Sequence, residues 1–354
     1  MNGIKSSKIN IAISWVELPA YGARLIRAGI ERLEYPVEVI ATIPQIPIKG
    51  MEEILGKKIH WIDKSNVSSW KDLHLPIPDI FFQAGRSYIP SFRKLGKEVR
   101  KHGGKVVLLS DNCWKNNIRQ WLGAVIYRLI YRRWFSAVWV PGKSGAKMMR
   151  IFGVPYAQIY QGLYGSDPDC FTAGPLLKQR PKHFIFVGKL IPAKGIPTLV
   201  KAFKLFHKDY PEWRLIVFGD GECRTLLEDS PGILVNPFVQ PPQIADALRK
   251  AIFLVLPTLT DHWPLVVSEA TLAGCGLILS DRVGNRAEFL NEKNGFVFSA
   301  HSVNELSNRL KEAASLPDWR LDEAYSESIR LGSFFGPAQW AQKFHQIISE
   351  VAGL

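Results

Sequence analysis

Short runs of apolar residues alternate with segments of helical periodicity along most of this chain. The alternation is clearest over residues 253–280, FLVLPTLTDHWPLVVSEATLAGCGLILS. The apolar run FLVL ends at Pro257, a polar loop follows, and apolar positions return at helical spacing from Pro264 to Gly274. A second apolar run, GLILS, closes the stretch. Short runs bounded by proline and glycine favour buried strands, so the stretch is predicted as strand, loop, helix and strand.

The N-terminal part of the chain has the same order of elements. Residues 8–14 and 35–42 are predicted as strands on either side of a helix over 24–33, and apolar runs at 78–83 and 105–112 continue the series. Strands that alternate with helices are typical of a parallel sheet with helices on both faces. A chain of 354 residues is expected to form two domains, at ~100–200 residues each. We therefore predict an α/β protein with two Rossmann-like domains.

The composition limits the class of protein and its location. Hydrophobic residues make up 47% and charged residues 22% of the chain, as in soluble globular proteins, and no apolar run has transmembrane length. The start of the chain lacks the apolar core of a secretory signal. The four cysteines show no C-x-x-C spacing, so neither a disulfide framework nor a zinc site is indicated. These features favour a reducing cytoplasm.

The net charge of +13 is unevenly distributed. No acidic residue occurs from Asn112 through Ser166, where basic and aromatic residues are interleaved. Within this segment, residues 114–135 are predicted as an amphipathic helix that contacts an anionic membrane surface. A helix whose aromatics pack into the core is the alternative, and a single-stranded nucleic-acid site is disfavoured because no nucleic-acid module is present. The residues concerned are Lys115, Arg119, Arg128, Arg132, Arg133, Lys143, Lys147 and Arg150, with Trp114, Trp121, Tyr127, Tyr131, Trp134 and Phe135.

Two groups of charged residues follow predicted strands of the C-terminal half. Asp261 lies in the loop before a helix, and Glu269 lies more than one turn inside that helix. Lys189 and Lys194 come after a strand that ends at Gly188 and before another helix. Loops at the carboxyl ends of parallel strands border the ligand crevice. Lysines and a helix N-terminus there suit a diphosphate, whereas carboxylates suit the hydroxyls of a sugar and a ribose.

These motifs resemble the donor-binding signature of retaining glycosyltransferases of the GT-B fold, in the large family 4 group. The family's E-x7-E pattern is present here as Asp261-x7-Glu269, and its VGRL-xxx-KG segment as VGKLIPAKG, with Lys189 in place of Arg. Two further departures are Asp261 for the first Glu and Pro264 where the family usually has Gly. Proline lacks an N–H, so one potential donor to phosphate is removed.

The resemblance implies a role for each residue of the signature. The two lysines and the backbone N–H groups of Leu265 and Val266 would stabilise the departing diphosphate. Asp261 would bind sugar hydroxyls, and Glu269 the ribose diol. The expected catalytic residues are Lys189, Lys194, Asp111 and Asp261. The expected donor-binding residues are Gly22, Gly188, Lys189, Lys194, Gly219, Val239, Asp261, Leu265, Val266 and Glu269.

Two of these residues come from the N-terminal half, where the resemblance is looser. Asp111 stands at the C-terminal end of a predicted strand, at the position of the family's His-Asp pair, and an N-cap of the next helix is its alternative role. Gly22 lies with Pro19 and Tyr21 in the predicted loop after the first strand, close to the family's proline and Gly-Gly pair. A plain tight turn is the alternative there.

The resemblance also implies an architecture and a reaction. Domains over 1–172 and 173–330 would face each other across a cleft, and a helix within 331–354 would cross back to the first domain. The chain would transfer a sugar from a nucleotide-sugar donor to an acceptor hydroxyl with retention. No metal or other cofactor is expected, and Asp167-x-Asp169 is not placed like a metal-binding motif.

The expected partners follow from this activity. They are the nucleotide sugar, a lipid-linked or saccharide acceptor of surface polysaccharide or glycolipid assembly, and an anionic membrane surface that meets residues 114–135. Nucleic acid is not an expected partner. The location implied is cytoplasmic, peripheral to the inner face of a membrane. The alternatives are a GT-B nucleotide-sugar epimerase and a non-catalytic protein that binds nucleotide sugars or polyanions.

Overall fold

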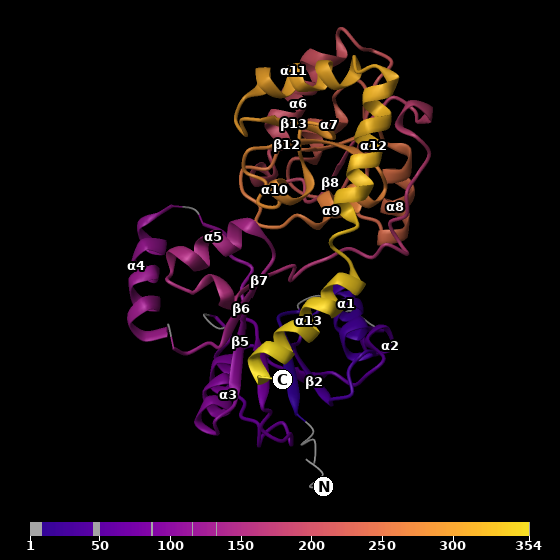
Figure 1. The fold of residues 1–354 in the computed structure, drawn as a ribbon. Coiled ribbons are helices and arrows are strands. Elements are labelled where there is room, and N and C mark those ends of the chain that lie inside the picture. The colour runs from indigo at the N-terminus through magenta and orange to yellow at the C-terminus, as the bar shows by residue number, and fades with distance from the viewer. Residues whose placement is uncertain (1–8, 45–49, 86–87, 115, 132, 354) are drawn as a thin grey trace. The chain divides into compact units, whose positions relative to one another are not determined.

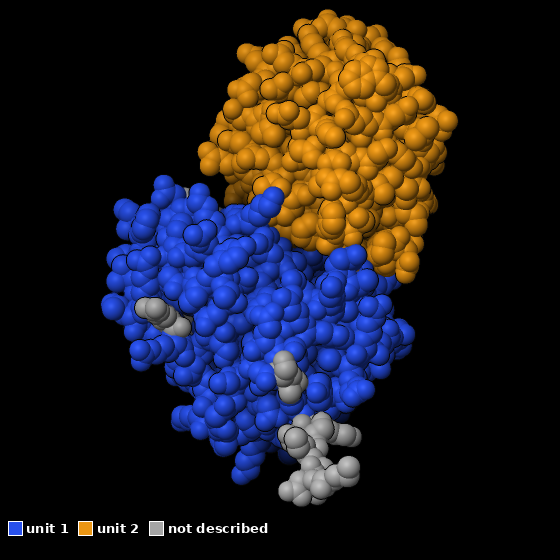
Figure 2. Space-filling model, viewed as in Figure 1, with its two compact units in different colours: residues 1–165, 337–354 blue, residues 166–336 orange. Residues whose placement is uncertain are grey.

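The computed structural model contains two compact units, shown in blue and orange in Figure 2. Unit 1 consists of residues 1–165 and 337–354, and unit 2 of residues 166–336. Each unit contains one β-sheet with helices packed on it (Figure 1). The residues that the structure describes are 9–44, 50–85, 88–114, 116–131 and 133–353.

Unit 1 contains a seven-stranded sheet in the order β3-β2-β1-β4-β5-β6-β7, in which every neighbouring pair is parallel. Successive side chains point to opposite faces, so Phe82 and Phe81 belong to two different core clusters. Because both faces of the sheet are buried, the strands appear in the sequence as continuous apolar runs. The strands are β1 (Ile11–Trp15), β2 (Val37–Thr42), β3 (His60–Ile62), β4 (Ile80–Gln83), β5 (Lys105–Leu109), β6 (Ala137–Val140) and β7 (Ile159–Gln161).

The C-terminal helix α13 (Pro337–Ala352) packs against α1 (Ala20–Ile30) and completes the core of unit 1. The Phe344 ring lies 4.7 Å from that of Phe82, and Trp340 Nε1 donates a 3.0 Å hydrogen bond to the carbonyl of Leu163. Burial of these aromatic rings fixes the end of the chain on the first sheet. The other helices of the unit are α2 (Met51–Leu55), α3 (Pro90–Lys101), α4 (Ile118–Ile126), its π-helical continuation η1 (Tyr127–Tyr131), α5 (Lys143–Ile151) and the 3₁₀ turn η2 (Tyr156–Gln158).

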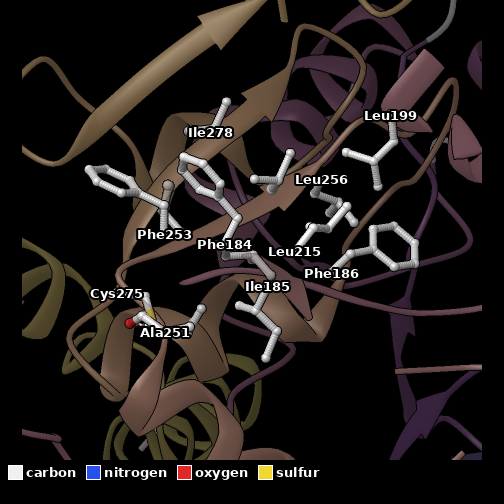
Figure 3. Close-up of a cluster of buried hydrophobic side chains, with 14 of the residues drawn as sticks. Phe184, Ile185, Phe186, Leu199, Leu215, Ala251, Phe253, Leu256, Cys275 and Ile278 are labelled. Atoms are coloured by element: carbon white, nitrogen blue, oxygen red, sulfur yellow. Dashed lines mark hydrogen bonds between the residues drawn. The ribbon is translucent and has the colours of Figure 1, made fainter. Parts of the chain in front are cut away.

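Unit 2 contains a six-stranded parallel sheet in the order β10-β9-β8-β11-β12-β13. Figure 3 shows part of its core, in which side chains such as Phe184, Leu215 and Phe253 are buried. The strands are β8 (His183–Val187), β9 (Arg214–Phe218), β10 (Ile233–Asn236), β11 (Phe253–Leu256), β12 (Gly276–Ser280) and β13 (Gly295–Phe298). The helices are α6 (Ile196–His207), α7 (Arg224–Glu228), α8 (Pro241–Lys250), α9 (Leu265–Leu272), α10 (Arg286–Phe289), α11 (Val303–Ala314) and α12 (Asp318–Gly332), with 3₁₀ turns η3 (Leu177–Gln179) and η4 (Pro192–Lys194).

Each sheet has one point at which the strand order reverses. The reversal lies between β1 and β4 in unit 1 and between β8 and β11 in unit 2. Loops that leave the carboxyl ends of the two strands at such a point diverge, and ligands of open α/β sheets bind in the crevice between them. The loops after these four strands are therefore the expected ligand-binding positions.

The predicted fold class, α/β with two Rossmann-like parallel sheets, is confirmed. Some boundaries differ from the prediction. Helix α1 begins at Ala20 and not near Arg24, with Pro19 in extended conformation at its N-cap, so Gly22 lies in a helical turn and not in a loop. Among the described residues, no helix is both long and apolar enough to cross a bilayer.

Candidate functional site

The reversal point of unit 2 brings two loops with charged residues together. The loop after β8 carries Lys189 and Lys194, and the loop after β11 carries Asp261. Lys194 Nζ and an Asp261 carboxylate oxygen form a short ion pair, in which the two side chains are 25% and 16% exposed. Partial burial reduces screening by water, so this pair is stronger than a fully exposed one. The structure thus joins two of the residues that sequence analysis had placed in the catalytic set.

Backbone contacts hold these two loops against each other. The N–H of Leu259 donates a 2.9 Å hydrogen bond to the carbonyl of Ala193. Gly195 adopts φ +73°, and a Cβ at this position would lie 1.9 Å from the carbonyl oxygen of Pro257. Only glycine combines this conformation with such a close approach. The close packing of the two loops therefore explains why a glycine directly follows Lys194 in the sequence.

A third loop, after β12, supports Asp261 and the start of α9. The N–H of Gly284 donates a 2.8 Å hydrogen bond to the carbonyl of Asp261. The buried Asn285 donates from Nδ2 to the carbonyl of Pro264 at 3.0 Å. Sequence analysis did not single out Asn285, because its contact spans 21 residues and carries no local pattern. These bonds fix the position of the turn that leads into α9.

The first turn of α9 presents backbone donors beside the ion pair. Pro264 is the N-cap, and Leu265 and Val266 are the first two helical residues, both half-buried. The N–H groups at the start of a helix have no intrahelical acceptor, and the helix dipole makes this end favourable for an anion. The predicted donors at Leu265 and Val266 are therefore at the helix start, as the sequence pattern required.

Glu269 lies one turn further along α9 and is half-buried. Burial raises the pKa of its carboxyl from 4.5 to about 7. Within the described part of the chain, no hydrogen bond or ion pair involves this carboxyl. A carboxyl of this kind is half-protonated near neutral pH and can both donate and accept a hydrogen bond.

The loops after β8, β9 and β10 are also connected to one another. A Cβ at Gly219 would lie 1.9 Å from the carbonyl oxygen of Gly188, so the two backbones are in close contact. The Asp220 carboxylate accepts a 3.0 Å hydrogen bond from the N–H of Phe238, which precedes the half-buried Val239. This bond and Arg224 lower the pKa of Asp220. Sequence analysis had named the glycines and Val239 but not Asp220.

Lys189 differs from Lys194 in its surroundings. Its side chain is exposed, and no ion pair to it occurs among the described residues. Its own backbone carbonyl accepts a 3.0 Å hydrogen bond from the N–H of Ile191, within the same turn. Lys189 is thus a freely hydrated cation on the loop, whereas Lys194 is held in place.

Unit 1 has a polar cavity of about 390 Å³ at its own reversal point. Asp111, which follows β5, is exposed on this cavity. The pKa of Tyr164 is raised well above the usual value, chiefly by burial and then by the charge of Asp111. Burial, Asp111 and Glu17 likewise raise the pKa of Tyr88. The lining residues are Trp15, Val16, Glu17, Pro19, Tyr21, Ala84, Gly85, Tyr88, Leu109, Asp111, Leu163 and Tyr164.

Gly22 is not a lining residue of this cavity. It is buried in α1, where a Cβ would lie 3.0 Å from Leu18 and 3.3 Å from the Trp15 ring. Its neighbours Pro19 and Tyr21 do line the cavity. Tyr88 and Tyr164 were missed as site residues, because an isolated tyrosine gives no motif and their meeting depends on the fold.

The described part of the chain contains no cluster suited to a metal ion. Among the described residues, no group of three or more His, Cys, Asp or Glu side chains lies together in a metal-binding arrangement. Asp167 of the Asp-x-Asp segment accepts a 3.0 Å hydrogen bond from the N–H of Asp169, which forms a local turn.

Comparison with known proteins shows sequence similarity over the C-terminal half of the chain. Residues 172–331 match the model of the family described as glycosyl transferases group 1. A D-inositol 3-phosphate glycosyltransferase of Gordonia bronchialis is 23% identical over 201 residues, which cover 49% of this chain and 43% of that protein. A UDP-Gal:alpha-D-GlcNAc-diphosphoundecaprenol alpha-1,3-galactosyltransferase of Escherichia coli is 26% identical over 144 residues, covering 38% of this chain and 37% of that one. The matches span less than half the length of both relatives.

The similarity to solved structures extends over the whole chain. Anabaena HepE, solved in complex with UDP and glucose, superposes with a TM-score of 0.74 over 98% of this chain and 100% of that chain, at 14% identity. The sucrose-phosphate synthase of Thermosynechococcus elongatus gives a TM-score of 0.73 with the same coverage and identity. The fold is GT-B. In this GT-B chain, the segment that matches the family model includes Lys194, Asp261 and Glu269, whereas Asp111 and Gly22 lie outside it.

Proposed function

We propose that this GT-B chain is a retaining glycosyltransferase that moves a sugar, of hexosyl type, from a nucleotide-sugar donor to an acceptor hydroxyl. The observation that carries the proposal is the Lys194–Asp261 pair at the reversal point of unit 2, next to the first turn of α9. The cation and the backbone N–H donors suit the phosphates of a glycosyl diphosphate, and the carboxylate suits its sugar hydroxyls. The match of residues 172–331 to a glycosyltransferase family supports the same activity.

The main requirement of this reaction is that the negative charge on the leaving diphosphate is stabilised. The bond between the anomeric carbon and the phosphate oxygen breaks, and a bond to the acceptor oxygen forms on the same face of the sugar. Lys189, Lys194 and the N–H groups of Leu265 and Val266 would stabilise the developing negative charge. The leaving phosphate would accept the proton of the acceptor hydroxyl, so the proposal requires no resident metal or further cofactor.

The two carboxyls of the signature would bind hydroxyls. Asp261 would accept hydrogen bonds from the transferred sugar while it keeps its contact with Lys194. Glu269, with a pKa of about 7, would pair with the ribose diol, whose hydroxyls both donate and accept. Gly188, Gly219 and Val239 would let the nucleotide approach the backbone closely.

Unit 1 would hold the acceptor. We assign the cavity beside Asp111 to the acceptor hydroxyl, with Asp111 orienting it, and the first turn of α1 at Gly22 to contact with the donor diphosphate. The relatives are named for a D-inositol 3-phosphate and a diphosphoundecaprenol-linked GlcNAc. A lipid-linked or saccharide acceptor of surface polysaccharide or glycolipid assembly fits this range. Such an acceptor would place the chain on the cytoplasmic face of a membrane, bound peripherally.

The test is release of nucleoside diphosphate from UDP-, GDP- and ADP-sugars with and without a panel of acceptors. Transfer predicts release that depends on an acceptor, and a product whose anomeric configuration, read by NMR, equals that of the donor. An inverted anomer would contradict retention. Interconversion of nucleotide sugars without acceptor would indicate the epimerase, and binding without any turnover the non-catalytic alternative.

A further inference from the structure

Helix α4 and its continuation η1 expose a continuous apolar face. Ile118 is 79% exposed, Leu122 61% and Leu129 80%. The exposed positions recur at intervals of three and four residues, so they lie on adjoining rows of one side of the helix. In Figure 1, α4 lies at the periphery of unit 1. The residues of this α4 face are Ile118, Trp121, Leu122, Val125, Ile126, Leu129 and Ile130.

The opposite side of the same helix is fixed to the protein. Ala124 and Tyr127 are buried, and the Tyr127 ring lies 5.6 Å from Phe152 and 6.4 Å from Phe135. Arg128 donates a 2.7 Å hydrogen bond to the carbonyl of Ile151. The α4 face is therefore held outward by the packing of its reverse side, and rotation of the helix to bury it would expose aromatic rings instead.

This arrangement corrects the expectation for residues 114–135. Sequence analysis favoured an amphipathic helix in contact with a membrane, and gave a helix whose aromatic residues pack into the core as the alternative. The structure turns most of them toward the protein, and Trp121 is the exception at 51% exposure. Residues 115 and 132 lie outside the described part of the chain. The exposed face is mainly aliphatic, which suits the acyl region of a bilayer more than the stacking of bases.

The charged residues of the segment that carries the α4 face have one sign. No acidic residue occurs between Asn112 and Ser166. Exposed cations on α4, η1 and α5 are Arg119, Arg128, Lys143, Lys147 and Arg150, and Arg133 follows η1. A second copy of this chain would bring a surface of the same charge to the contact, whereas an anionic lipid surface is complementary.

We propose that the α4 face inserts into the interface of a bilayer that contains anionic lipids, with the surrounding arginines and lysines on the headgroups. The aliphatic side chains supply the hydrophobic contact, and the cations concentrate the protein at the surface. This proposal concerns the partner of unit 1. It deepens the membrane location given above, and it stands whether or not the chain transfers a sugar.

The test is cosedimentation of the full chain with vesicles of phosphatidylcholine alone, and with vesicles in which about a third of the lipid is phosphatidylglycerol. The wild type is expected to bind the anionic vesicles at least ~10-fold more strongly than the neutral ones. The double variant Leu122→Gln/Leu129→Gln should lose about 10-fold or more of this binding. The matched control is Leu226→Gln/Leu234→Gln, which alters two leucines of unit 2 that are 48% and 53% exposed and should bind as wild type does.

A charge variant separates the two contributions. Arg119→Gln/Arg133→Gln should weaken binding to anionic vesicles by about 5-fold per residue and leave binding to neutral vesicles unchanged. Circular dichroism melts establish that each variant is folded. Equal binding of the Leu122/Leu129 variant and wild type, or binding that ignores the anionic lipid, would overturn the proposal. So would a dimer in analytical ultracentrifugation that only this leucine variant abolishes, because the face would then meet a second copy.

Discussion

Lys194 and Asp261 form an ion pair between the loops that leave the two central strands of unit 2, 67 residues apart in sequence. The loops themselves are joined by the hydrogen bond from Leu259 to Ala193. The lysine is thus oriented before any ligand arrives, and a diphosphate at the start of α9 would share it with Asp261. Orientation in advance is what makes an electrostatic contact effective in a transition state.

Replacement of Lys194 by alanine should reduce turnover on the order of 10²–10³-fold, because the leaving diphosphate loses an oriented cation. Steady-state release of nucleoside diphosphate measures this effect. Lys182→Ala is the matched control, since Lys182 forms an ion pair with Glu212 on the surface of the same unit. Near-normal turnover of Lys194→Ala would remove this lysine from the proposed mechanism.

Glu269→Gln should change the pH dependence of stability. The pKa of Glu269 is raised from 4.5 to about 7 in the folded chain. Ionisation is thus disfavoured by folding, and its destabilising effect grows as pH rises from about 4.5 to about 7 and is constant above. The variant should match wild type at pH 4.5 and be more stable at pH 8 by roughly 2–3 kcal/mol. Urea denaturation at both pH values measures this difference, and a difference independent of pH would show that Glu269 ionises normally.

Tyr164→Phe should affect the use of the acceptor and not the binding of the nucleotide. The variant loses the hydroxyl that interacts with the Asp111 carboxylate, at a cost of about 1 kcal/mol in unfolding free energy. It should raise KM for the acceptor or lower kcat and leave nucleotide affinity unchanged. Tyr156→Phe, at a tyrosine that is 71% exposed, is the control. If Tyr164→Phe weakened nucleotide binding instead, the assignment of this cavity to the acceptor would be wrong.

Gly195→Ala should disrupt the contact between the two loops. Gly195 and Gly103 both have positive φ, but a Cβ at Gly195 would lie 1.9 Å from Pro257, whereas nothing lies within 4 Å of one at Gly103. Gly103→Ala should lower the free energy of unfolding by only about 1–2 kcal/mol, which is the cost of a residue with a Cβ at positive φ. Gly195→Ala should cost more in unfolding free energy and also lose activity. Equal effects of the two substitutions would contradict the close approach.

The sequence could predict that these charged residues of unit 2 lie near strand ends and a helix start because they belong to short motifs. Lys194 and Gly195 are adjacent, and Asp261 and Glu269 flank one helix start, so local spacing is enough to find them. Tyr164 and Asn285 act through contacts with distant segments, and their residue types alone indicate nothing. Helix α12 was not predicted because its buried residues are Ala324, Glu327, Ser328 and Gly332, which form no apolar stripe.

The orientation of α4 shows the same limit of prediction from sequence, here for a surface of the protein. Aromatic and aliphatic residues alternate on this helix, and either set could have faced outward. The choice depends on Phe135 and Phe152, which offer rings for Tyr127 to pack against. Periodicity predicts that a helix has two faces, whereas tertiary packing decides which one is covered.

The most direct test of the donor site in unit 2 is a thermal-shift panel of UDP, GDP, ADP and their common sugar conjugates, with wild type and Glu269→Ala. A ligand at 100 times its dissociation constant adds about 2.7 kcal/mol to the stability of the protein that binds it. We predict that one nucleotide family raises the melting temperature of the wild type and that Glu269→Ala loses this shift. No shift with any nucleotide, or an equal shift in the variant, would contradict the account.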